Sequence, residues 1–294
     1  MRYRITHRTT YGYDDDVNDS LGIAYLTPRT LPWQTPLSST VTIRPYPSDR
    51  SDDTDHYGNS ALFFQVTTPH RELVVTGSSE VEVLPTAYDR DALAVPWELA
   101  QPASRADLPG AWRAVDLTLP SPQVELTEAA GAYAAHSLAP GRPLGEAVDD
   151  LVHRIFTDFD YDATATTVTS TIADVLSTRA GVCQDFAQLA IAGLRAHGLA
   201  ARYVSGYLST LPPPGHDRVV GADASHAWLA VWVPGEAGGH WLAVDPTNDV
   251  RVGDRHVTVA WGRDYGDVPP LKGVIFTDAE TSTLSVEVDV EPVG

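Results

Sequence analysis

The first residues of the chain alternate between two kinds of side chain. Arginine, threonine and other polar residues hold the even positions, and the odd positions are occupied by Tyr3, Ile5, His7, Thr9 and Tyr11. A period of two is typical of a β-strand with one buried face. The pattern therefore predicts a half-buried strand, which we expect to end in an exposed turn at the aspartates 14–16 and at Asn18 and Asp19.

Further apolar runs predict more strands in the first third of the chain. They cover residues 21–26, 40–44, 61–67 and 73–84, and turn-forming residues such as Pro45 separate them. Short strands without intervening helical patterns are typical of all-β domains. We therefore predict a β-sandwich-like N-terminal region over residues 1–90.

Helical spacing begins only after a connection at residues 91–124, in which prolines recur and no period is visible. Apolar residues then repeat every three to four positions over 125–138 and 143–156, and a short helix is expected at 172–177. Together with the strands described below, these helices predict an α+β core over residues 125–294.

The strongest helical pattern lies between Cys183 and Gly198. Apolar residues occupy two of its faces, which predicts a buried central helix, and Gly198 stands where a glycine commonly ends a helix. Cys183 falls in the first turn, where unpaired N–H groups and the helix dipole favour the thiolate form. On this stretch alone, an inert buried cysteine remains an equal alternative to a nucleophile.

A β-hairpin is predicted downstream of this helix. Residues 225–233 and 240–245 are apolar runs, and a short connection containing three glycines joins them. If Val233 lies opposite His240, then His226 is diagonal to Asp245 on the neighbouring strand, close enough for the two side chains to meet. A preceding strand is expected at 201–209, and the polar loop at 212–225 is predicted to form an adjustable wall beside the hairpin.

Composition narrows the possible functions. The formal net charge of −19 disfavours binding to nucleic acid or to anionic membranes, and no apolar run reaches the length of a membrane span. The single cysteine excludes an internal disulfide and a cysteine-based zinc site. We therefore expect a soluble cytoplasmic protein that uses no cofactor or metal and that acts on a peptide or protein substrate.

Cys183, His226 and Asp245 are the residue types of a thiol-dependent catalytic triad. The thiolate would attack an amide or ester carbonyl, the imidazolium would protonate the leaving group, and the carboxylate would orient the imidazole. This set predicts a cysteine hydrolase of the peptidase or amidase type that works through a thioester. Transfer of the acyl group to an amine and a catalytically silent scaffold remain the alternatives.

Several motifs resemble those of the transglutaminase-like superfamily, in its bacterial branch. They are GVCQDFA at 181–187, SHAW at 225–228 and DPTN at 245–248, and residues 2–84 resemble the N-terminal region of that branch. The resemblance implies a papain-like core, in which the helix carrying the cysteine packs on an antiparallel sheet, and the triad Cys183, His226 and Asp245. It also suggests Tyr161 as a counterpart of the aromatic residue that contributes to the oxyanion hole in animal transglutaminases.

Overall fold

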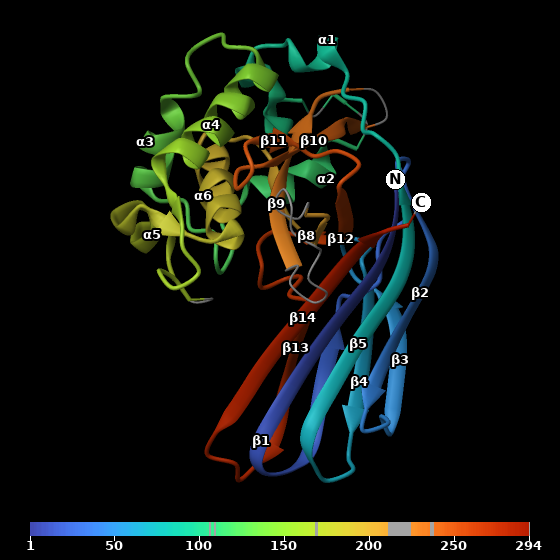
Figure 1. The fold of residues 1–294 in the computed structure, drawn as a ribbon. Coiled ribbons are helices and arrows are strands. Elements are labelled where there is room, and N and C mark those ends of the chain that lie inside the picture. Colours follow the sequence, from blue (N-terminus) through green and yellow to red (C-terminus); the bar gives the residue numbers. More distant parts are fainter. Residues whose placement is uncertain (106, 109, 168–169, 211–224, 236–237, 294) are drawn as a thin grey trace, which may run out of the picture.

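The described residues form two antiparallel sheets, a two-stranded parallel sheet and a group of helices. The computed structural model describes residues 1–293 apart from 106, 109, 168–169, 211–224 and 236–237. In Figure 1 the helices of residues 128–196 lie on one side of the smaller sheet, and the long strands of the larger sheet extend away from both. Among the described residues, no helix is long and apolar enough to cross a membrane. The cytoplasmic location stays a prediction.

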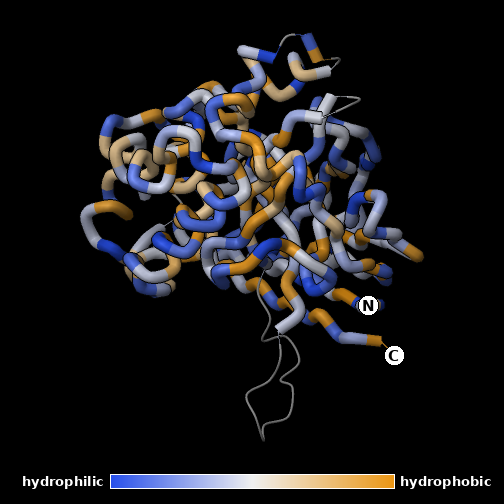
Figure 2. Tube along the Cα trace, turned by 90° about the horizontal axis from the view of Figure 1, so that it is seen from above, coloured by the Kyte–Doolittle hydropathy of each residue, from blue (hydrophilic) through white to orange (hydrophobic). Residues whose placement is uncertain are grey.

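The larger sheet contains both ends of the chain. Its seven strands are β1 (Arg2–Ala24), β2 (Gln34–Arg44), β3 (Asp49–Thr54), β4 (Ser60–Val66), β5 (His70–Val83), β13 (Leu271–Thr277) and β14 (Ser282–Pro292). The first half of β1 lies between β5 and β14, and its second half lies between β4 and β13. Because Tyr3 pairs with Pro292, the two termini lie side by side (Figures 1 and 2).

The predicted turn at residues 14–16 is wrong, because β1 continues through them to Ala24. The register shifts in its pairing with β5, between Gly12 and Val17, and in its pairing with β13, between Val17 and Asp19. Arg71 forms ion pairs of 2.8 Å with both Asp15 and Asp16. This partner lies more than fifty residues away in the sequence, so the local pattern of acidic residues gives no sign of it.

The predicted strand-rich N-terminal region is confirmed, with one strand that the pattern missed. β3 is exposed along its whole length and therefore has no alternation of buried and exposed residues. The three domain boundaries stay predictions. The pairing of β1 with β13 and β14 adds that residues 271–292 lie in the same sheet as residues 2–83.

The second sheet has the order β11-β10-β9-β8-β12. Its strands are β8 (Ala201–Leu208), β9 (Ser225–Val233), β10 (His240–Asp245), β11 (Val250–Arg251) and β12 (His256–Gly262). Around it lie α3 (Glu128–Ala135), α4 (Leu144–Asp158), α5 (Ile172–Thr178) and α6 (Cys183–Ala196). The connection contains the short helices α1 (Arg90–Leu93), η1 (Trp97–Ala100), η2 (Pro102–Ser104), α2 (Trp112–Val115) and η3 (Asp116–Thr118). The predicted helices and hairpin strands are thus present.

The helix that carries the cysteine lies at the centre of this region. α6 contacts β8 and β9, and nearly all of its residues are buried, as its two apolar faces predict. Gly198 follows the helix with φ of 75°, a backbone conformation that suits glycine. In Figure 2 hydrophobic stretches run through the middle of the molecule.

The two sheets share one hydrophobic core and are joined by side-chain hydrogen bonds. Tyr3 and Ile5 of β1 belong to the same buried cluster as the residues of α6. The Gln34 side chain of β2 donates to the carbonyl of Thr258 and accepts from its N–H, both at 2.7 Å. These contacts fix the larger sheet beside β12, at the edge of the smaller one.

Candidate active site

The local fold places Cys183 at the first position of α6. The carboxylate of Asp185 accepts hydrogen bonds from the Val182 N–H at 2.8 Å and from the Thr166 hydroxyl at 2.7 Å, which closes the N-terminus of the helix. A side chain at Gly181 would meet the same carboxylate at 2.8 Å, so only glycine fits there. The N–H of Cys183 has no acceptor within the helix and is available to stabilise an oxyanion.

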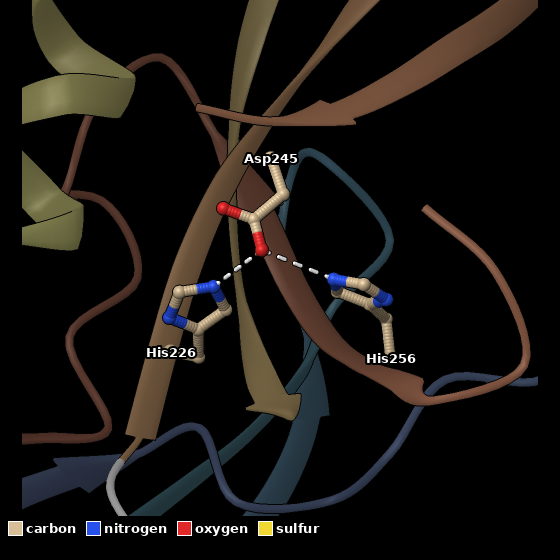
Figure 3. Close-up of side chains that lie close together, drawn as sticks. All are labelled: His226, Asp245 and His256. Atoms are coloured by element: carbon tan, nitrogen blue, oxygen red, sulfur yellow. Dashed lines mark hydrogen bonds and ion pairs between the residues drawn. The ribbon is translucent and has the colours of Figure 1, made fainter. Parts of the chain in front are cut away.

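The hairpin has the predicted register. His240 pairs with Val233, and the ladder continues to the pair of Val244 with Leu229. Figure 3 shows the result: Nε2 of His226 and Oδ2 of Asp245 are 2.7 Å apart. The predicted contact between these two side chains is therefore present.

Asp245 is fully buried and accepts four hydrogen bonds. Its Oδ1 accepts from the Thr247 N–H at 3.0 Å, and its Oδ2 accepts from Asn248 at 2.7 Å and from two histidines, His226 and His256. Burial raises the pKa of Asp245, but the hydrogen bonds and charges of the two histidines outweigh it and hold the pKa below its usual value. Asp245 is thus a carboxylate at neutral pH.

His256 is the member of this group that the sequence did not predict. Its Nε2 lies 3.1 Å from Oδ2 of Asp245, opposite His226 (Figure 3). Its ring packs edge-on against Trp228. The N–H of Gly253 points to the other ring nitrogen at 3.5 Å, which favours the tautomer with the proton on Nε2. His256 can therefore donate from Nε2 to Asp245.

His226 interacts with both Asp245 and Cys183, and both interactions affect its pKa. Burial lowers the pKa of His226, but hydrogen bonds with Asp245 and Cys183 and the charges of both groups raise it to about 10. Since Nε2 faces Asp245, Nδ1 is the ring nitrogen left for Cys183. His226 therefore lies between the carboxylate of Asp245 and the side chain of Cys183.

Cys183 and His226 line a cleft of about 340 Å³. Tyr161, the proposed oxyanion-hole residue, also lines it, and its strand β6 (Asp160–Tyr161) pairs with β7 (Ala180–Gly181) immediately before Cys183. Burial and the nearby charge of Cys183 raise the pKa of Tyr161, so its hydroxyl keeps its proton at neutral pH. Tyr161 thus lines the cleft with a hydroxyl that can donate a hydrogen bond, and its role in the oxyanion hole stays a prediction.

Two other predictions concern this region, namely the loop at 212–225 and the expectation that the protein uses no metal. The loop predicted as an adjustable wall lies almost entirely outside the described residues, since 211–224 are not described. Among the described residues, ligand atoms of His226, Asp245 and His256 lie within 4.8 Å of one another, a set able to hold a metal ion. Hydrogen bonds from both rings and from Asn248 to Oδ2 account for this convergence without an ion.

Comparisons with known proteins agree with this architecture. Residues 3–82 match the family model of the bacterial transglutaminase-like N-terminal region, and residues 132–246 match that of the transglutaminase-like superfamily. An uncharacterized protein of Mycobacterium tuberculosis (strain ATCC 25618 / H37Rv) is 50% identical over 99% of this chain and 93% of its own length. The chain belongs to the transglutaminase-like superfamily. The resemblance inferred from its motifs is confirmed.

Two further similarities bear on this member of the superfamily. The crystal structure of a candidate cysteine protease from Cytophaga hutchinsonii covers 100% of this chain and 92% of its own, with a TM-score of 0.75 and 21% identity, which confirms the predicted fold class. A protein-glutamine gamma-glutamyltransferase of Pseudomonas aeruginosa is 39% identical over 77 residues, which are 26% of this chain and 11% of that protein.

Proposed function

We propose that this superfamily member is a cysteine-dependent hydrolase that cleaves amide or isopeptide bonds of a peptide or protein substrate. The observation that carries the proposal is the position of His226, which faces Cys183 on one side and Asp245, 2.7 Å away, on the other. This arrangement supports a nucleophilic sulfur and a proton donor in one cleft, with an orienting carboxylate buried behind the imidazole.

The proposed reaction has two steps. The Cys183 thiolate attacks the amide carbonyl, and the N–H of Cys183 and the Tyr161 hydroxyl stabilise the oxyanion. As the thioester forms, the imidazolium of His226 gives its proton to the departing amine or ammonia. The neutral imidazole then removes a proton from water, which attacks the thioester, and the carboxylic acid leaves with the thiolate restored.

The test is substrate profiling with a peptide and glutaminyl library, measured by the appearance of new amines, ammonia and acids. Wild-type protein is expected to release acid product, and Cys183→Ala is expected to release none above background, because no thioester can form. Equal product with both proteins would overturn the proposed nucleophile. No product with either would favour the binding scaffold.

Acyl transfer to an amine is the second candidate, and the 77-residue similarity to a protein-glutamine gamma-glutamyltransferase favours it. Hydrolysis and transfer share the thioester and differ only in the group that attacks it. The two are separated by offering a reactive glutaminyl peptide together with a lysine analogue and weighing both products. We expect the acid to exceed the amine adduct at millimolar amine, and the reverse result would make the protein a transferase.

A further inference from the structure

The cleft beside Cys183 has a second wall that comes from the larger sheet. His7, Thr9 and Tyr11 of β1 and Leu284 and Val286 of β14 line it opposite the cysteine helix. β1 and β14 pair so that Thr9 faces Val286 and Tyr11 faces Leu284. Directly paired residues share a face of an antiparallel sheet, so these side chains form one continuous surface.

The solvent exposure of this surface increases along β14, from Val290 to Leu284. Val288 and Val290 of β14 are almost completely buried, because they pack against the catalytic region. Val286 and Leu284 continue the same face but are 49% and 60% exposed. The apolar face therefore extends from the shared core into the cleft and beyond it, although solvent-exposed positions of a sheet are usually polar.

Charge is segregated between the two faces of this strand pair. Glu287, Asp289 and Glu291 alternate with the apolar residues of β14 and lie opposite Arg8, Thr6 and Arg4 on the other face. The described residues that line the cleft include no aspartate, glutamate, lysine or arginine, although the chain carries a net charge of −19. Tyr11, Leu284 and Val286 carry no charge, so a charged substrate side chain lying against them would lose water without gaining a counter-ion from these residues.

We propose that the face formed by Tyr11, Leu284 and Val286 is a specificity wall that receives an uncharged apolar or aromatic side chain of the substrate, next to the bond that Cys183 attacks. The inference rests on the proposed function and names the class of substrate. The wall is continuous with the cleft that contains the sulfur, and its residues bury apolar area without offering an ionic partner.

The experiment compares rates of alkylation at Cys183, which do not require turnover. The probes are iodoacetamide and iodoacetyl derivatives of phenylalanine amide, aspartate and lysine, each of which loses iodide as the thioether forms. In the wild-type protein the phenylalanine probe is expected to react about tenfold faster than either charged probe, after correction for their rates with free cysteine.

In Leu284→Asp and Val286→Asp, the ratio of the rate with the phenylalanine probe to the rate with the charged probes is expected to fall about tenfold. Both positions are exposed, so neither substitution opens a cavity in the core. Ser285→Asp is the matched control, because Ser285 pairs with Thr10 and points to the opposite face of the same strand. Both its preference and its rate with plain iodoacetamide are expected to equal those of the wild type.

Two results would overturn the wall. One is an equal rate for the apolar and charged probes in the wild type, and the other is a preference that all three variants retain. Failure of the proposed function has a different signature, since the phenylalanine preference would persist in a protein that turns over no peptide. A preference that Ser285→Asp also loses would assign the effect to charge in general and overturn the wall as well.

Discussion

Polar residues are buried in the smaller sheet and mostly exposed to solvent in the larger one. β8 and β9 are buried on both faces, and the polar group at their end is a closed network in which Asp245 accepts four hydrogen bonds. In the larger sheet, buried and exposed residues alternate strictly over residues 2–9 of β1, and the charged residues of this segment lie on the solvent face, where Arg4 pairs with Glu291. One sheet thus carries the proposed chemistry, while the other supplies a wall and a scaffold.

This difference has consequences for substitution. A buried donor or acceptor that loses its partner costs its full desolvation energy, whereas an exposed ion pair exchanges its partner for water. We therefore expect large effects in the smaller sheet and small ones on the solvent face of the larger sheet. His7 is the exception that connects them, because it is a buried histidine of β1 hydrogen-bonded to Tyr207 of β8.

The largest effect is expected for Asp245→Asn. The neutral amide can no longer stabilise the imidazolium or fix its tautomer, so turnover should fall by about 10³ to 10⁴. The unfolding free energy should fall by about 1–3 kcal/mol, because donors that now face the carboxylate would face an amide N–H₂. Both quantities are measured beside Asp249→Asn, whose side chain contacts His153 at the surface. Turnover within a few-fold of wild type would remove Asp245 from the triad.

The residues that the sequence predicts well are those whose neighbours are close in the chain. The register of the hairpin follows from one short connection, so the contact between His226 and Asp245 could be calculated by counting residues. Cys183 was located by helical spacing and by Gly198, again within a single element.

Residues that meet through distant strand pairing were not predictable in this way. His256 reaches Asp245 because β12 lies beside β8, about fifty residues earlier in the chain. Leu284 reaches the cleft because β14 pairs with β1 across almost the whole sequence. No local period predicts either pairing. The sequence therefore predicts the candidate triad, but it predicts neither His256 nor the wall that contains Leu284.

His256 offers the next test of the buried network. His256→Phe keeps a ring against Trp228 but removes the donor to Asp245, so turnover should fall about tenfold to a hundredfold. His256→Gln can still donate and should recover much of this loss. In an Asp245→Asn background the phenylalanine substitution should add little, because both changes act through the same carboxylate. Additive losses, or no loss in His256→Phe, would show that His256 does not position Asp245.

The pH dependence of stability should reveal the buried His7. Burial lowers the pKa of His7 to about 4, below the value of 6.5 expected in the unfolded chain. Because the unfolded chain takes up the proton first, the free energy of unfolding is unaffected by protonation of His7 above pH 6.5. It falls by about 3 kcal/mol as the pH drops from 6.5 towards 4. His7→Gln should unfold with a weaker pH dependence across this range, measured by urea denaturation. The exposed His56→Gln is the control, and a slope in His7→Gln equal to wild type would contradict the assignment.

The smallest effect is expected for the ion pair on the solvent face of the same strand. Arg4 lies three residues before His7 and meets Glu291 at 2.9 Å, but both side chains are about half exposed. Water and salt screen such a pair, so Arg4→Ala should change the unfolding free energy by less than about 0.5 kcal/mol and leave turnover unaltered. The measurement is urea denaturation at low and high salt, with Glu291→Ala and the double variant to complete the cycle. A coupling energy above about 1 kcal/mol would mean that this face contributes to stability like the buried one, and the contrast between the two sheets would be lost.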